Sequence, residues 1–175
     1  MAGFGGQGML LAGKILAHAA MGDGLEVSWL PSYGPEMRGG TANVTVCISP
    51  EPIGSPLITT PQGLVAMNKP SLDKFAPHVR PGGVIVYNAS LIEQGPDRDD
   101  CRVFAVDSRA LAEQTGTVRS ANFAMLGAWV AAAEAIDPAS MERAIGEEFS
   151  GRKAKFVPSN VAAFRAGIAA VEEQQ

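Results

Sequence analysis

Cysteine and histidine are scarce in this sequence, which has two of each among 175 residues. Cys47 and Cys101 stand far apart in the chain, and so do His18 and His78. Neither a tetrahedral metal site nor a four-thiolate iron–sulfur cluster can therefore be assembled from this chain alone, and no metal site is expected. Two isolated cysteines are typical of small buried thiols in a reducing compartment, so we expect no disulfide.

The chain also lacks an excess of basic residues, a long apolar run and a basic N-terminal segment. Its 14 Lys and Arg are outnumbered by 18 Asp and Glu, which gives a formal net charge of −4. A nucleic-acid partner, which needs a basic face, is therefore not expected. Because no apolar run reaches about 18 residues and the chain opens directly on glycines, the sequence predicts neither a membrane span nor a signal peptide. The predicted location is the cytoplasm.

A self-contained catalytic set is missing as well. No Ser/His/Asp, Cys/His or paired-carboxylate arrangement has a spacing that would bring its members together, so we expect no catalytic residue in this chain. The length and the hydrophobic content of 46% suffice for one buried core. Residues 1–175 are therefore predicted to form a single domain.

The sequence does contain short apolar runs that alternate with longer segments of helical period. This pattern predicts an α/β, three-layer, Rossmann-like fold, in which helices flank a mostly parallel sheet. The expected strands are Glu26–Leu30, Asn43–Ser49, Leu64–Met67, Val84–Tyr87 and Arg102–Val106. The expected helices are Met9–Met21, Ser71–Val79, Ser120–Ala135, Pro138–Phe149 and Pro158–Glu173, of which the last three make up a helical C-terminal third.

Helix ends and one helix face are also readable from the sequence. Ser71, Ser120 and Asp137 are each placed to cap a helix, the last of them before a proline at the first helical position. Gly127 and the alanines at 131–133 leave one helix with a narrow face. That face is expected to approach the sheet or a partner subunit closely.

Ten of the 20 glycines lie within the first 40 residues, and four of them form a G-x-G-x-x-G motif at Gly3–Gly8. The motif leads into a predicted helix, whose N-terminus favours anions. A dinucleotide site would also need a preceding strand and an acidic residue at the end of the second strand. Only two residues precede the loop, so we expect that first strand to be missing, and Trp29–Ser32 carries no carboxylate. The loop therefore serves close packing, a phosphate-bearing ligand other than a dinucleotide, or a partner's loop.

A second glycine-containing loop, Pro31–Thr41, follows the second predicted strand. At the carboxyl edge of a parallel sheet it would lie beside the first loop. Arg38 can fork onto a phosphate or carboxylate, and Glu36 can pair with it or face a partner, unless both only bond their own loop. Tyr33 is expected to be a packing residue with a polar tip rather than a catalytic acid. Asn68 and another asparagine, Asn88, end strands at the same edge as turn formers or helix caps, or as ligand contacts.

Three segments together resemble the gamma subunit of the 2-oxoacid:ferredoxin oxidoreductases. They are GFGGQGMLLAGKIL (3–16), SYGPEMRGGTANVTVCIS (32–49) and AMNKPSLDKFAPHVRPGGVIVYNASLI (66–92). The resemblance is collinear and runs from residue 2 to about residue 164. The second segment is most similar to 2-oxoglutarate and branched-chain 2-oxoacid members, with pyruvate and indolepyruvate enzymes close by. The chain differs from them in lacking strand residues before the glycine loop.

The resemblance implies a subunit of a multi-subunit enzyme that oxidatively decarboxylates a 2-oxoacid, with 2-oxoglutarate favoured, and forms acyl-coenzyme A, CO2 and reduced ferredoxin. Thiamine diphosphate and the iron–sulfur clusters would belong to partner subunits, alpha and beta, and a ferredoxin-like delta subunit where one is present. This chain would bind no cofactor alone and would support assembly and the coenzyme A side of the site.

Carried onto this sequence, the resemblance makes the amides of Gly5, Gly6, Gln7 and Gly8 the candidates for a phosphate. Arg38 would be the cationic partner, and Tyr33, Glu36 or Asn68 would shape the pocket or a subunit contact. Two other functions stay open at this stage: a free-standing nucleotide-binding reductase, and a pure interaction module.

Overall fold

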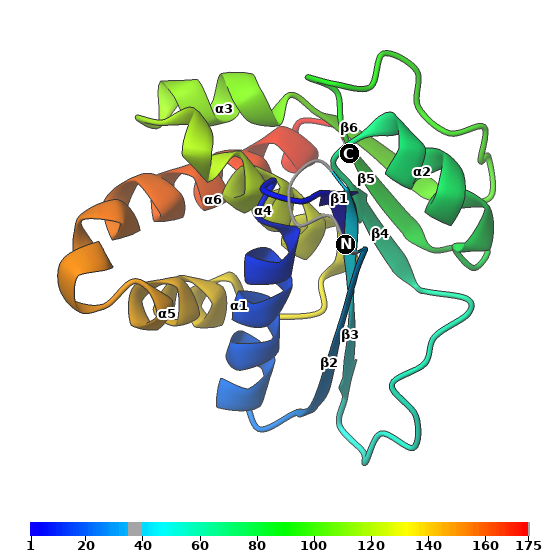
Figure 1. The fold of residues 1–175 in the computed structure, drawn as a ribbon, viewed down its shortest axis with the longest axis horizontal. Coiled ribbons are helices and arrows are strands. Elements are labelled where there is room, and N and C mark those ends of the chain that lie inside the picture. The colour runs from blue at the N-terminus through cyan, green and yellow to red at the C-terminus, as the bar shows by residue number, and fades with distance from the viewer. Residues whose placement is uncertain (35–39, 175) are drawn as a thin grey trace.

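The structure of this protein, a computed structural model, describes residues 1–34 and 40–174. A six-stranded sheet runs through the molecule in the order β2-β3-β1-β4-β5-β6 (Figure 1). The strands are β1 (Ala2–Phe4), β2 (Glu26–Tyr33), β3 (Thr41–Ser49), β4 (Gly63–Ala66), β5 (Val84–Asn88) and β6 (Arg102–Val106). The helices are α1 (Met9–Gly22), α2 (Lys69–Phe75), α3 (Ser108–Gln114), α4 (Ala121–Ala133), α5 (Pro138–Glu148) and α6 (Val157–Glu172). Short 3₁₀ turns are η1 (Ala76–His78), η2 (Val118–Ser120) and η3 (Gly151–Phe156).

The sheet is mixed, although most of its strands point the same way. β1, β4, β5 and β6 pair in parallel, whereas β3 pairs antiparallel with both β1 and β2. Among the described strands β3 therefore runs alone against the others. The prediction of a mostly parallel α/β sheet is confirmed, with a β2–β3 hairpin at one side.

The strand expected to be missing is present. β1 consists of three residues and includes Gly3 of the glycine motif, and it lies between β3 and β4. Main-chain bonds hold it on both sides: the Val44 amide donates to Met1 O at 2.8 Å, and the Met67 amide donates to Ala2 O at 2.9 Å. A strand this short carries no sequence pattern, because neighbouring strands rather than its own side chains define it.

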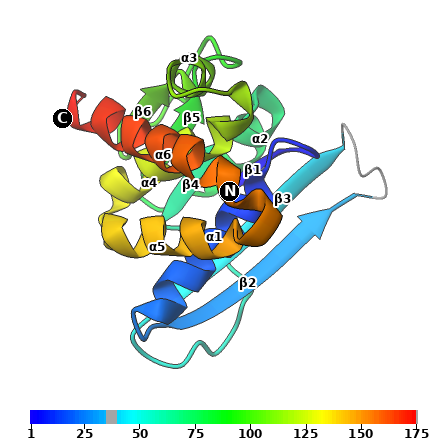
Figure 2. The same ribbon diagram turned by 90° about the vertical axis from the view of Figure 1, so that its left-hand side faces the viewer.

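Helices cover both faces of the sheet, unequally. α1 and α4 pack on one face with α5 and α6 outside them, and α2 covers the other face over β4 and β5 (Figures 1 and 2). The larger hydrophobic core is centred on α1 and α4 and contains Ile15, Phe123 and Phe164. The smaller one joins Leu72 of α2 to Ile85 of β5.

The narrow face of the alanine-rich helix contacts another helix rather than the sheet. A Cβ atom on Gly127 of α4 would stand 1.9 Å from Phe164 O, and one on Gly167 of α6 would stand 1.9 Å from Ala124 O. The two helices therefore meet backbone to backbone, which the absence of side chains at these two positions permits. The expected close approach is confirmed, and its neighbour is α6.

Two of the three helix caps predicted from the sequence differ in the structure. Asp137 accepts from the Ala139 amide at 3.0 Å, as predicted. Ser120 occupies the cap position of α4 but donates its hydroxyl to Asn160 at 2.8 Å instead. α2 begins before Ser71, because Asn68 accepts from the Ser71 amide at 2.9 Å and caps the helix.

Candidate functional site

The glycine loop connects β1 to α1 at the carboxyl edge of the sheet. Gly6 and Gly8 have φ values of 99° and 77°, in the left-handed region that favours glycine, and Gly8 stands at the cap position of α1. Gly5 donates to Gly40 O at 2.8 Å, and Gln7 donates to Phe4 O at 3.1 Å. Within the described residues the amides of Gly6 and Gly8 make no hydrogen bond. Two of the four predicted phosphate donors, Gly5 and Gln7, are therefore used by the fold, and the other two have no acceptor among residues 1–34 and 40–174.

The bond from Gly5 to Gly40 joins the two glycine-containing loops. β2 and β1 run in the same direction, so the hairpin loop after Tyr33 reaches the edge where the glycine loop lies. The prediction that the two loops are neighbours is confirmed. Glu36 and Arg38 lie outside the described residues, so their predicted roles remain predictions.

Tyr33 ends β2 with 63% of its surface exposed, so it packs little against the described part of this chain, and its predicted role at a pocket or subunit contact remains a prediction. Trp29 and Leu30 on the same strand are 40% and 37% exposed. β2 is an edge strand of the sheet, with no further strand of the described chain beside it. The hairpin thus exposes large apolar side chains on a strand whose outer backbone edge is unpaired within the described residues.

Gln7 and Asn68 connect the loop after β1 to the loop after β4. Oε1 of Gln7 accepts from the Phe4 amide at 2.6 Å and from Nδ2 of Asn68 at 3.2 Å. Asn68 is 3% exposed, and its other side-chain end caps α2. Asn68 therefore positions Gln7, and its predicted contact with a ligand or a subunit remains a prediction.

Asn88 fixes the next strand end. Its Oδ1 accepts from the Ser90 amide at 3.2 Å and from the Ser108 hydroxyl at 2.8 Å, and its Nδ2 donates to Met67 O at 3.4 Å. The predicted turn-forming role is confirmed. A ligand contact by this side chain remains a prediction.

A cavity of about 360 Å³ lies beside these residues, between the glycine loop, the ends of β4 and β5, and the segment from α3 to α4. Its polar lining includes Gln7, Ser108, Arg109, Arg119 and Asn122. Of these residues, Ser108, Arg109, Arg119 and Asn122 were not predicted from the sequence. Asn122 carried a usable signal, since it is a polar residue in the first turn of an otherwise apolar helix.

The carboxylate of Asp107, which follows β6, accepts hydrogen bonds from within the chain and has a structural role. Asp107 caps α3 by accepting from the Ala110 amide at 2.9 Å, and it also accepts from the Ser90 hydroxyl at 2.6 Å. These bonds to the ionised form, chiefly that from Ala110, hold the pKa of Asp107 below its ordinary value. Asp107 therefore stays charged at neutral pH as a structural group beside the cavity.

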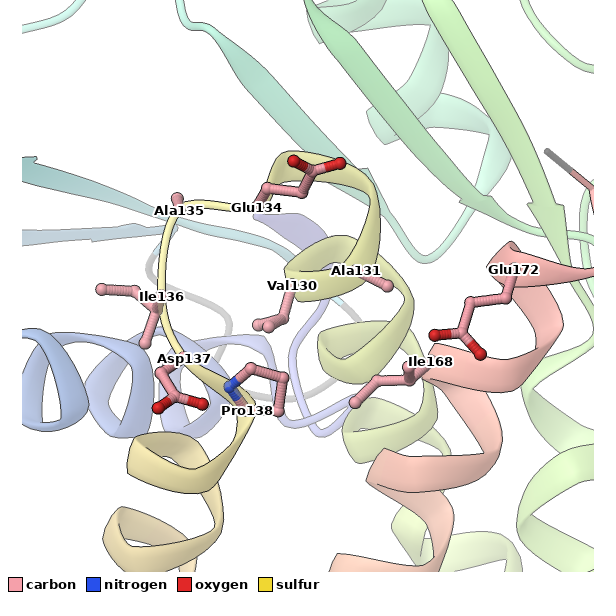
Figure 3. A pocket seen from close by; sticks show the side chains of 9 residues that line it. All are labelled: Val130, Ala131, Glu134, Ala135, Ile136, Asp137, Pro138, Ile168 and Glu172. Atoms are coloured by element: carbon pink, nitrogen blue, oxygen red, sulfur yellow. The ribbon is translucent and has the colours of Figure 1, made fainter.

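A larger hollow of about 470 Å³ lies at the other end of α4, away from the glycine loop. Its floor contains Val130, Ile136 and Ile168, and Figure 3 shows Glu134, Asp137 and Glu172 standing apart around it. Among the described residues no group of three metal-ligating side chains stands close enough to hold an ion. The three carboxylates therefore form a dispersed acidic rim.

The scarce cysteines and histidines lie apart in space as well. His18 on α1 and His78 on η1 are both exposed. Cys47 lies in β3, Cys101 directly precedes β6, and both are free and half-buried. The thiols are thus less buried than expected. In the described ranges, no helix combines the length and apolar character needed to cross a membrane.

Fold and site together define an α/β domain whose loops converge at the carboxyl edge, where such sheets bind ligands. The family model for pyruvate ferredoxin/flavodoxin oxidoreductase matches residues 1–170. The chain therefore belongs to the pyruvate ferredoxin/flavodoxin oxidoreductase family, as a domain of the gamma-subunit type.

Individual relatives agree with this assignment. The chain is 44% identical over 168 residues to the ketoisovalerate oxidoreductase subunit VorA of Methanothermobacter marburgensis, covering 95% of this chain and 35% of that protein. It is 36% identical over 148 residues to the 2-oxoglutarate synthase subunit KorC of Methanocaldococcus jannaschii, and the match covers 83% of this chain and 79% of that protein. The crystal structure of a keto/oxoacid ferredoxin oxidoreductase gamma subunit from Geobacter sulfurreducens superposes on this chain with a TM-score of 0.83 and is 30% identical in sequence. The superposition covers 98% of this chain and 96% of that subunit. The chain thus spans about a third of the length of the ketoisovalerate relative.

Proposed function

We propose that this chain is the gamma-type part of a 2-oxoacid:ferredoxin oxidoreductase, which converts a 2-oxoacid and coenzyme A to acyl-coenzyme A, CO2 and reduced ferredoxin. In this proposal the chain supports assembly and forms the coenzyme A side of the site. The observation that carries it is the bond from Gly5 to Gly40, which brings both glycine-containing loops to one ligand-binding edge in a chain of this family.

The chain's own contribution to coenzyme A would be electrostatic. The amides of Gly6 and Gly8, which have no acceptor in the part of the chain that the structure describes, lie at the N-terminus of α1, where the helix dipole favours a phosphate. We propose that Arg38 supplies the cation, with Glu36 and Tyr33 shaping the pocket or a subunit contact. Gln7 and Asn68 hold the loop in place.

The cysteines of this chain do not fit an iron–sulfur cluster. Cys47 and Cys101 are separated in the fold and supply two of the four thiolates that a cluster takes. We therefore propose that the clusters belong to alpha, beta and, where present, ferredoxin-like delta subunits, and, from the family resemblance, that thiamine diphosphate does too. When bound there, thiamine diphosphate supports decarboxylation and the clusters carry single electrons to ferredoxin.

Assembly would use the exposed edge of the hairpin. Figure 2 shows β2 and β3 extending to one side of the helical layers. The exposed Trp29, Leu30 and Tyr33 on edge strand β2 offer apolar area and unpaired backbone groups to another subunit. This arrangement supports a chain that works within a complex rather than alone.

The 2-oxoacid is the finer part of the proposal. The tyrosine loop favours 2-oxoglutarate or a branched-chain substrate, and the higher identity to ketoisovalerate relatives favours the branched-chain 2-oxoacid. Turnover of 2-ketoisovalerate and 2-oxoglutarate by the assembled enzyme, compared under saturating coenzyme A, decides between them.

We propose that the enzyme is cytoplasmic. We also propose that residues 1–175 form a single domain, and a single cooperative unfolding transition would support that domain assignment.

The test is reconstitution. The chain is purified alone and with its alpha and beta partners, and 2-oxoacid- and coenzyme A-dependent reduction of ferredoxin is measured. Activity is expected only in the complex, and Arg38→Ala is expected to raise the KM for coenzyme A about tenfold with assembly intact. Arg152→Ala is the matched charge control. Activity of the isolated chain, or an equally active complex without it, would overturn the proposal.

Two rival functions give different results in the same experiments. Tight binding of NAD(H) or FAD to the isolated chain would indicate a free-standing reductase, although β2 ends at Ser32 and Tyr33 without the carboxylate that ribose requires. Loss of assembly on Arg38→Ala, with no effect on coenzyme A in any complex that remains, would indicate a pure interaction module.

A further inference from the structure

The hollow of about 470 Å³ at the far end of α4 has an acidic rim and an apolar floor, and its described lining contains no basic residue. Glu134, Asp137 and Glu172 form the rim, and none of them makes an ion pair within residues 1–34 and 40–174. Arg165, on the same helix as Glu172, is already paired with Glu142. The described part of the chain therefore leaves the rim negative, which favours a cationic occupant.

Helix ends add to this negative potential. α4 ends at Ala133 and α6 ends at Glu172, so the carbonyl ends of both helices lie beside the hollow. The N-terminus of α5 lies there too and would favour an anion, but Asp137 already caps it by accepting from the Ala139 amide at 3.0 Å. Because helix C-termini attract cations, the hollow suits a positively charged group next to an apolar one.

The chain itself exposes a segment with the complementary chemistry. All residues of η3 are exposed, among them Lys153, Lys155 and Phe156. Nζ of Lys155 stands 5.2 Å from the centre of the Phe156 ring, so a cation and an apolar surface are presented together. Neither lysine makes an ion pair in the described ranges. Of the carboxylates just before η3, Glu148 is paired with a lysine of α1, and Glu147 is outnumbered by the basic residues of η3.

The hollow and η3 lie at opposite ends of the same pair of helices. α5 begins at the hollow with Pro138 and ends just before η3, and α6 returns from η3 to Glu172 at the hollow (Figures 1 and 3). The 11 residues of α5 span about 16 Å. A second copy related by a two-fold rotation, with its α5–α6 pair antiparallel to the first, would place each η3 at the other copy's hollow. The same contact would then form twice, as in most two-subunit assemblies.

We propose that two copies of this chain associate in this way, with Lys153, Lys155 and Phe156 of each copy in the acidic hollow of the other. The lysines face the carboxylates of the rim, and the phenylalanine ring covers the apolar floor. This surface is separate from the β2 edge and from the glycine loop, so the inference goes beyond the proposed function.

Sedimentation velocity of the full chain from about 1 to 100 μM measures the association, and we expect the fraction of a two-copy species to rise with concentration. Two double variants reverse the charges. The hollow variant is Glu134→Lys with Glu172→Lys, and the turn variant is Lys153→Glu with Lys155→Glu. Each is expected to weaken the association about tenfold or more, because like charges then face each other. All four side chains are exposed, so their replacement leaves the fold intact.

Mixing the two variants gives the sharper result. In a mixed pair the new lysines of one hollow face the new glutamates of the other copy's η3, and the second contact is the native one. Both contacts are then attractive, so the mixture is expected to regain the affinity that each variant alone has lost. Glu51→Lys with Glu93→Lys makes the same charge change as the hollow variant at exposed positions outside the hollow, and it is expected to leave the association unchanged.

Several outcomes would overturn the inference: a wild-type chain that stays monomeric at about 100 μM, no recovery on mixing, open-ended larger species, or an equal effect of the control pair. If the wild-type chain is monomeric and the hollow variant instead weakens binding to the alpha and beta subunits, a basic segment of a partner subunit occupies the hollow and the second copy does not. Because sedimentation uses the chain without its partners, failure here is distinguishable from failure of the reconstituted activity.

Discussion

Gln7 and Asn68, 61 positions apart in sequence, are joined by a hydrogen bond of 3.2 Å that links the loops at the carboxyl ends of β1 and β4. α1 leaves β1 toward one face of the sheet, and α2 leaves β4 toward the other. The bond therefore spans the point where the chain's connections change direction, which is where open α/β sheets bind ligands.

Removing the Gln7 side chain should destabilise this junction. In Gln7→Ala, the buried Nδ2 of Asn68 and the Phe4 amide both lose their acceptor, and we expect a loss of about 1–3 kcal/mol in the free energy of unfolding. Gln7→Glu keeps an acceptor oxygen and should lose less. Urea unfolding of both variants measures the difference, and equal losses would show that the hydrogen bonds do not hold the loop.

Replacing glycine by alanine should have opposite effects on stability at Gly127, in the backbone contact of α4 with α6, and at Gly146, which lies outside it. Gly127→Ala would place a methyl group 1.9 Å from Phe164 O and should destabilise the chain by about 2 kcal/mol or more. Gly146→Ala, on α5, meets nothing within 4 Å and should stabilise it by about 0.5–1 kcal/mol. Thermal unfolding compares them, and similar melting temperatures for the two variants would contradict the contact.

The hydrogen bond between Ser120 and Asn160 connects η2 to α6 inside the protein. Both side chains are at least 95% buried, so Asn160→Ala leaves the Ser120 hydroxyl without its acceptor at a cost of about 1–3 kcal/mol. Adding Ser120→Ala should cost less than the two single changes together, because each removes the same bond. Strict additivity in this double-mutant cycle would argue against the pairing.

The cap of α3 predicts a contribution to stability that depends on pH. Because the pKa of Asp107 is lowered in the folded chain, the carboxylate stabilises the fold fully above its ordinary pKa and loses that contribution as the pH falls through the lowered value. Asp107→Ser retains a capping oxygen that does not titrate, so its stability should depend less on pH below about 4. Asp107→Ala should lose about 1 kcal/mol at neutral pH. Unfolding measured from pH 2 to 7 tests both.

The exposed edge of β2 predicts a variant that affects assembly alone. Tyr33→Ser should leave the stability of the isolated chain within about 0.5 kcal/mol, since 63% of that side chain is exposed. It should weaken association with the alpha and beta subunits about tenfold, measured by titration of the purified parts. Leu57→Ser changes an apolar residue that is 73% exposed outside the hairpin and serves as the control. Equal effects of both would argue against the hairpin as the interface.

Local patterns carried the prediction of most elements. Apolar runs and proline and aspartate positions located five of the six strands and five helices close to their observed bounds, because these signals depend on nearby residues. α3 was missed, since its seven residues are too few to show a helical period. β1 was missed because its stability comes from β3 and β4 rather than from Ala2–Phe4 itself.

The sequence by itself determined the α/β class, the convergence of two glycine-containing loops and the resemblance to the family, each of which depends on order and spacing along the chain. Only the tertiary structure decided that Tyr33 is exposed, that two of four loop amides are already bonded, and that Arg119 and Asn122 border the same cavity as Gly6. The reason is distance along the chain: Asn122 bonds Gly8 across 114 positions, and no local pattern records a contact that the packing of α1 against α4 creates.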